Sequence, residues 1–164
     1  MQKWQRRLLG ALALGGGFLG VTIAFSLLIS PGLVVLGRLL VLPFIAVYCW
    51  GSWCGLRLLE GDESSLKANR LFWMLQIPHL MSPIAGYLFA SGALFYVTFR
   101  PTDLNVGAIV RLGSQFEYSI LQADKPLTFG VNLLAVGVVL FLTRQVRREP
   151  SNNSFKPNPL RGSA

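Results

Sequence analysis

One histidine, His79, stands inside a long apolar stretch of the chain that covers residues 71–99. The polar and kinking residues of this stretch are Gln76, Pro78, His79, Ser82 and Pro83. A titratable group in a membrane span is costly unless it faces protein or water, so these side chains could contact a transported solute or ion. Prolines kink a helix and free carbonyl groups, so His79 could instead donate to a carbonyl beside the kink at Pro78 and Pro83. The second, structural interpretation is favoured.

Arg38 is a charged residue within the second apolar stretch, six residues after Gly32. Its side chain can snorkel toward the outer membrane surface, or it can face inward and pair with a lipid, a substrate or the loop carboxylate Glu117. Snorkelling is the simpler account. The sequence therefore gives one candidate polar intramembrane site, formed by Gln76, His79, Ser82 and Arg38.

The inventory for catalysis is poor. Cys49 and Cys54 lie five residues apart, which separates them by about 140° around a helix, and no C-x-x-C motif occurs. The sequence also has no H-E-x-x-H motif, no phosphate-binding loop and no nucleophile elbow. We therefore predict no catalytic residue, no metal and no cofactor, with the two thiols as structural residues.

Glycines recur at a spacing that suits close helix packing. Gly15, Gly17 and Gly20 formally match G-x-G-x-x-G, but a dinucleotide fingerprint needs a strand before it and an acidic residue after it. Small residues four positions apart instead let helix backbones approach closely in lipid. The predicted helix-packing positions are Gly16, Gly20, Gly51, Gly55 and Gly86.

Four apolar runs, at about 8–29, 33–56, 71–99 and 127–146, determine the predicted fold. Each is near the roughly 20 residues that a membrane-crossing helix needs, and hydrophobic residues make up 52% of the 164-residue chain. Backbone polar groups in lipid must be satisfied within the segment, which favours helices. The expected fold is all-α: a four-helix transmembrane bundle in residues 1–148, followed by a disordered tail in 149–164.

The basic residues predict the orientation. With a cytoplasmic amino terminus, 11 of the 15 Lys and Arg residues fall on the inside, so both termini are expected in the cytoplasm. The first run is too long for the apolar part of a cleaved signal, and it lacks a small-x-small site, so it is interpreted as an uncleaved anchor. The net charge of +8 fits anionic lipid headgroups better than nucleic acid, because the basic residues flank the apolar runs.

Residues 100–126 form an outside segment in this prediction. Residues 106–112 and 115–121 flank Gly113-Ser114 and favour a β-hairpin with a type II′ turn. An interfacial helix is the alternative, because the apolar residues also fit helical spacing.

The end of the chain carries a resemblance. Its last residues, SNNSFKPNPLRGSA from Ser151 to Ala164, resemble the carboxyl-terminal peptides translated through the recombination sites of bacterial integron gene cassettes. The resemblance covers this tail alone and none of the membrane body. It implies a bacterial origin and a location in the inner membrane, and it implies nothing about activity.

Three functional hypotheses follow from the sequence. The first is a small, non-enzymatic, multi-pass inner-membrane protein that acts through helix packing with itself or with a membrane-protein partner. The second is a transporter or channel-like protein with a polar site at the kinked third span, and the third is a membrane-embedded enzyme. Besides the lipid bilayer, the expected partners are a second copy or another membrane protein.

Overall fold

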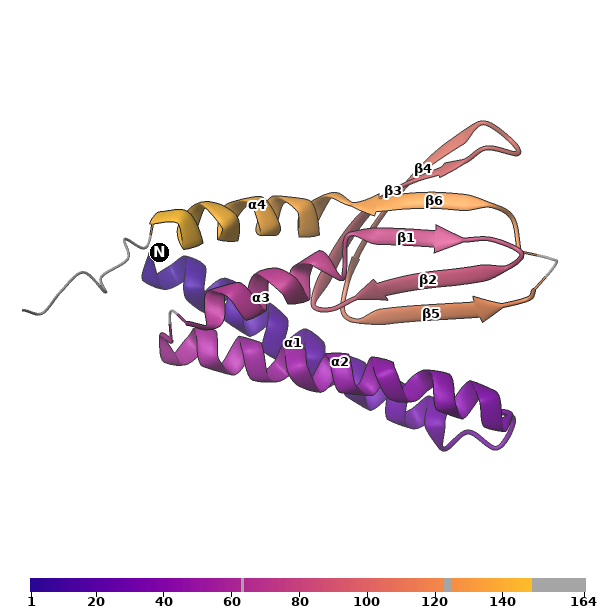
Figure 1. The fold of residues 1–164 in the computed structure, drawn as a ribbon, viewed down its shortest axis with the longest axis horizontal. Helices are drawn as coiled ribbons and strands as arrows, with labels where there is room; N and C mark the ends of the chain where they lie inside the picture. Colours follow the sequence, from indigo (N-terminus) through magenta and orange to yellow (C-terminus); the bar gives the residue numbers. More distant parts are fainter. Residues whose placement is uncertain (63, 123–124, 149–164) are drawn as a thin grey trace, which may run out of the picture.

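The chain begins with two long helices that form an antiparallel hairpin. The structure is a computed structural model that describes residues 1–62, 64–122 and 125–148. Helix α1 (Lys3–Leu28) and helix α2 (Val35–Glu60) pack along their length, as Figure 1 shows. Gly10 and Gly55 lie where the two backbones meet, and Gly17 lies against the Tyr48 carbonyl and Ser52. Side chains this small let the two helix axes approach closely.

Helix α2 ends at a glycine. Gly61 adopts a left-handed conformation, with φ at 94°, which an L side chain rarely adopts. Its amide donates to the Leu58 carbonyl, and the Asp62 amide donates to the Arg57 carbonyl, which is the bonding pattern of a Schellman cap. The chain then reverses into the short helix α3 (Ser65–Met74).

An antiparallel sheet follows the three helices. In the described residues its strands are β1 (Pro78–Met81), β2 (Ala85–Ala90), β3 (Ala93–Arg100), β4 (Asn105–Leu112), β5 (Gln115–Ile120) and β6 (Thr128–Asn132), in the spatial order β4-β3-β6-β1-β2-β5. Helix α4 (Leu133–Arg148) continues directly from β6 and packs on α3. The fold is therefore α+β.

The predicted all-α four-helix bundle is wrong. Residues 71–99 form the end of α3 and three strands, and 127–146 form β6 and most of α4. Pro78 is the first residue of β1 and Pro83 lies in the β1–β2 turn, positions where a strand tolerates proline. No kinked third span exists, because these prolines do not lie inside a helix.

The outside segment is also different from the prediction. Residues 105–112 and 115–120 are strands, so the interfacial-helix alternative is wrong. They do not pair with each other as a hairpin, however, because β4 pairs with β3 and β5 pairs with β2. The Gly113-Ser114 link joins the two edge strands of the sheet.

The short link between β4 and β5 requires the sheet to curl. In a flat sheet, β4 and β5 would be five strand spacings apart, about 24 Å at about 4.8 Å each. The three peptide steps from Leu112 to Gln115 span at most about 11 Å. The Gly113 amide also donates to the Gly92 carbonyl at 2.9 Å, which draws the β4–β5 link to the β2–β3 link. Figure 1 shows β4 running obliquely to β1 and β2.

The register assigns every strand residue to one of two faces. The helix face carries Tyr87, Phe89, Phe116 and Tyr118, whose rings contact Phe44 of α2 at centroid distances between 4.9 and 6.3 Å. The opposite face, here called the His79 face, carries a buried cluster of Leu88, Ala90, Leu94 and Tyr96. The main core lies between the sheet and the helices and includes Tyr48, Phe72, Trp73 and Leu142.

Candidate functional site

The α1–α2 hairpin exposes a large apolar surface. Both helices are long and apolar enough to cross a membrane; at 26 residues each they reach about 39 Å at 1.5 Å per residue. Only 39% of the most apolar window of α1 and 28% of that of α2 are buried. The exposed side chains include Phe18 at 70% and Val35 at 73% exposure. The exposed large apolar residues from position 18 to position 42, the half of the hairpin that contains its turn, are Phe18, Leu19, Ile23, Phe25, Ile29, Val34, Val35, Leu36, Leu39 and Leu42.

The basic residues gather at the other end of the molecule. Figure 1 shows the start of α1, the α2–α3 connection and the carboxyl-terminal end of α4 at one end, opposite the turn of the hairpin. These segments carry Lys3, Arg6, Arg7, Arg57, Lys67, Arg70, Arg144 and Arg147. In the described residues, the molecule thus has one basic end and one apolar end.

The structure separates the four predicted site residues. Arg38 is exposed near the start of α2. Ser82 lies in the β1–β2 turn, where its hydroxyl donates to the Ala85 carbonyl at 2.7 Å and accepts from the Ala85 amide at 3.0 Å. Gln76 and His79 are linked through Tyr96. Its hydroxyl is within hydrogen-bonding distance of the Gln76 carbonyl, at 3.2 Å, and of the Phe89 carbonyl, at 3.0 Å, and its ring packs 5.1 Å from the His79 ring.

His79 lies in the middle of a row of residues that crosses the sheet. The register places Gly107, Thr98, Gly130, His79, Leu88 and Glu117 in this row. Burial of the half-buried imidazole lowers the His79 pKa, and the negative charge of Glu117 opposes part of that shift. Glu117 also pairs with Lys125 at 3.0 Å. The row thus holds a histidine whose neutral form burial favours, with a paired carboxylate two strands away.

Buried polar atoms without a partner within the described residues lie near this row. Gln76, Ser91, Ser119 and Asn132 are each at most 3% exposed, and each has one such atom: Nε2 of Gln76, Oγ of Ser91 and Ser119, and Nδ2 of Asn132. The rest of the Gln76 amide is bonded, because its Oε1 accepts from the Ser91 amide at 2.9 Å. Buried groups of this kind are usually satisfied by protein or by ordered water.

The open half of the helix face forms an apolar groove of about 710 Å³. Its side chains come from β1, β3, β4 and β6, whereas α2 covers the β2 and β5 half of the same face. Phe99, Phe129 and Val131 are between 41% and 48% exposed there.

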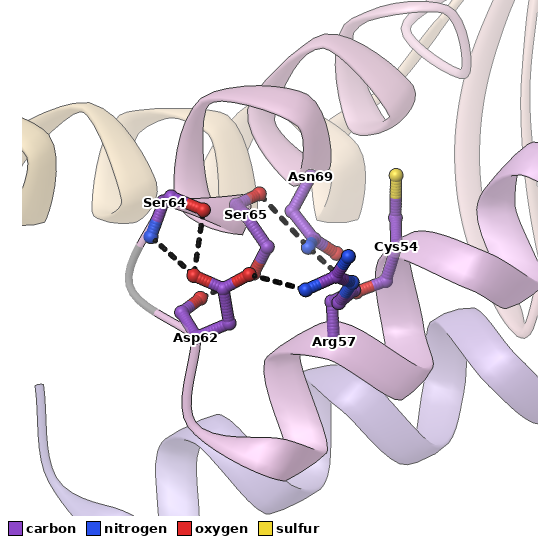
Figure 2. A network of polar contacts seen from close by, with 6 residues as sticks. All are labelled: Cys54, Arg57, Asp62, Ser64, Ser65 and Asn69. Atoms are coloured by element: carbon purple, nitrogen blue, oxygen red, sulfur yellow. Dashed lines mark hydrogen bonds and ion pairs between the residues drawn. The ribbon is translucent and has the colours of Figure 1, made fainter.

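A polar network joins α2 to α3. Figure 2 shows Asp62 accepting from the amide and hydroxyl of Ser64, at 3.0 and 2.6 Å, and pairing with Arg57 at 3.2 Å. The hydrogen bond from the Ser64 hydroxyl, more than the charge of Arg57, lowers the Asp62 pKa. Asn69 bridges the two helices by donating to the Cys54 and Ser65 carbonyls. The bonds of this network run between the two helices and their connection, which makes it a structural joint.

The predicted packing glycines lie against different elements. Gly20 faces the Tyr48 ring of α2 and Gly55 faces the α1 backbone. Gly51 faces the Phe72 ring of α3, and Gly16 faces the backbone of the β2–β3 link. Gly86 lies on β2, with the side chains of Ser119 and Met81 packed against it. Cys49 is exposed and Cys54 is buried, and both thiols are free.

Tyr96, Ser91 and Ser119 are polar residues of this region that sequence reasoning missed. A signal for Tyr96 was present in the alternation of residues 94–99, where Leu94, Tyr96 and Thr98 share one face and the intervening residues share the other. Reading the run as a helix hid this alternation. Ser119 gave no comparable signal, because only the pairing of β5 with β2 places it over Gly86.

Comparison with known proteins adds no family to these observations. No protein-family model, no curated protein and no solved structure matches the chain. The tail from Ser151 to Ala164, which carries the resemblance to integron cassettes, lies outside the described residues.

Proposed function

We propose that this chain is a small, non-enzymatic protein of the bacterial inner membrane, held there by the α1–α2 hairpin, which acts through contacts with a second copy or a protein partner. The exposed apolar surface of the hairpin carries this proposal. Helices buried in a soluble core would have most of their length covered, whereas most of the apolar window in each of these helices is exposed. Soluble monomers rarely expose an apolar patch of this extent.

The free surface of α1 also argues against a helix that lies flat on the membrane. Interfacial helices combine an apolar face with a strongly polar one. Between Leu8 and Ile29, α1 carries no charged residue. Insertion therefore fits this composition better than surface adsorption.

The charge distribution supports a cytoplasmic location for the basic end. Lys and Arg residues flanking a membrane segment favour the cytoplasmic side, and each contributes about 1 kcal/mol of attraction to anionic lipid near the surface. A hairpin that inserts from this side returns the chain to the same side. The resemblance of the tail to integron cassettes supports a bacterial inner membrane.

The channel hypothesis loses its structural basis. It required a kinked membrane helix around His79, and His79 lies on a strand instead. The partner-binding hypothesis keeps its support, because exposed apolar surface remains on both the hairpin and the sheet.

Membrane extraction of the full chain tests the proposal. We expect the protein to stay in the membrane pellet after an alkaline carbonate wash. Replacing two exposed hairpin residues near the middle of the apolar runs, Phe18→Glu and Leu42→Glu, should release a large fraction, because a charge near the bilayer centre costs about 3 kcal/mol. The control Leu104→Glu changes a residue that is 79% exposed in the β3–β4 turn and should stay in the pellet. Recovery of the unaltered chain from the aqueous fraction without detergent would overturn the proposal.

A further inference from the structure

Strand β4 is an edge strand with unusually little protection. Among residues 1–62, 64–122 and 125–148 it has one neighbouring strand, β3, and seven of its eight residues are exposed. Natural edge strands are usually short, charged, bulged or interrupted by proline. The register from Ala93↔Leu112 to Arg100↔Asn105 is continuous, so β4 contains no bulge, and Arg111 is its one charged residue.

The hydrogen-bond phase identifies which residues of β4 face the open edge. The Gly113 amide donates to the Gly92 carbonyl, so Gly92 and Gly113 form a hydrogen-bonded pair of the ladder. Because such pairs alternate along an antiparallel ladder, Gly107, Ile109 and Arg111 bond to β3. The residues whose backbone N–H and C=O groups point away from β3 are Val106, Ala108, Val110 and Leu112.

This edge is complementary to itself. If two β4 strands pair antiparallel about a twofold axis at Ile109, Val106 lies opposite Leu112 and Ala108 opposite Val110. On the other face Arg111 lies opposite Gly107, which has no side chain, so the two arginines do not face each other. The four outward-facing residues of each strand would then form about eight hydrogen bonds.

We propose that β4 is a homodimerisation edge, at which two copies join their sheets through Ile109 at the twofold axis. The apolar pairing and the separation of the like charges favour a second copy over an unrelated strand. The inference does not depend on membrane insertion. In water, an open sheet edge tends to pair with another strand. In lipid, leaving the backbone N–H and C=O groups of that edge without hydrogen bonds costs still more free energy.

A charge swap at Ile109 tests both the partner and the register. The Ile109→Lys and Ile109→Glu variants should each be monomeric in mild detergent, with half the mass of the unaltered protein, because like charges face each other at the axis. Mixing the two should restore a dimer with one chain of each kind. Ile109→Thr is the matched control and should remain dimeric. A monomeric parent chain, or variants that stay dimeric alone, would overturn the proposal.

Cross-linking gives a second test, which can be carried out even if the charged variants do not fold. Residues at a non-hydrogen-bonded position lie about 4.5 Å apart between Cα atoms, which a disulfide can bridge. Ile109→Cys should therefore form a disulfide-linked dimer under mild oxidation well above the level of the parent, which already contains Cys49 and Cys54. Val110→Cys should not exceed the parent, because Val110 faces Ala108 of the second copy. Equal cross-linking at both positions would exclude this register.

Discussion

His79 combines a half-buried ring with a group that titrates near neutral pH. Its Nδ1 atom is buried without a partner within the described residues, and its ring packs on Tyr96. A charged imidazole in this position would lose hydration that its surroundings do not replace. The neutral form is therefore the one that the folded sheet accommodates.

This preference makes stability depend on pH. Because burial lowers the His79 pKa from its ordinary value of 6.5, the unfolded chain binds more protons below that pH and gains stability relative to the fold. We expect the Tm to fall as the pH drops from 8 to 5.5, and His79→Gln to reduce that fall. Thermal unfolding of both proteins at the two pH values measures it. An equal fall in both would show that His79 is not responsible.

At the scale of elements, the contact between α1 and the β2–β3 link fixes how the sheet sits on the hairpin. A Cβ atom added to Gly16 would overlap with the backbone of Gly92, while one added to Gly15 meets nothing within 4 Å. The Ser114 hydroxyl donates to the Gly16 carbonyl at the same place. Gly16 therefore allows the backbones of a helix and a sheet link to touch.

Two alanine substitutions separate this contact from helix propensity. Gly15→Ala should raise the free energy of unfolding by up to about 1 kcal/mol, because alanine favours the helix. Gly16→Ala should lower it by about 1–3 kcal/mol, because the methyl group forces the packed backbones apart. Chemical denaturation in one detergent compares the two proteins. Equal changes would contradict the close contact at Gly16.

The first two elements were predictable from the sequence, and the sheet was not. Residues 8–29 and 33–56 lie almost entirely within α1 and α2. A continuous apolar run of length 71–99 also fits several strands, and periodicity cannot separate the two when both strand faces are apolar. The prolines at positions 78 and 83 were the available warning, because a helix tolerates them poorly.

The candidate site was less predictable than the fold. Gln76 and His79 were recognised from their types, and the contact of both with Tyr96 arises from the connection between α3 and β1 and from the β3–β6–β1 register. Ser91 and Asn132 are brought near them by links and registers that span up to 56 residues of sequence. Pairings over such distances leave no local pattern in the chain.

For the whole molecule, the separation of a basic end from an apolar end predicts how the chain responds to charge at the hairpin turn. Ser30 and Gly32 lie in that turn, which must cross the bilayer if the hairpin inserts from the cytoplasmic side. Basic residues resist translocation more than polar ones do. The turn is therefore the place where added charge should change the topology most.

We expect Ser30→Lys with Gly32→Lys to reduce the fraction of chains whose turn reaches the periplasm, whereas Ser30→Asn with Gly32→Asn should leave it unchanged. A fluorescent reporter fused after Ala164 should stay active in the cytoplasm in every variant, because a hairpin keeps both flanks on one side. Labelling of a cysteine introduced at Pro31, with a reagent that does not cross the inner membrane, measures the exposure of the turn. Labelling that is equal in the lysine and asparagine variants would show that this turn does not cross. A reporter found in the periplasm would place the basic end there and reverse the orientation that the charges predict.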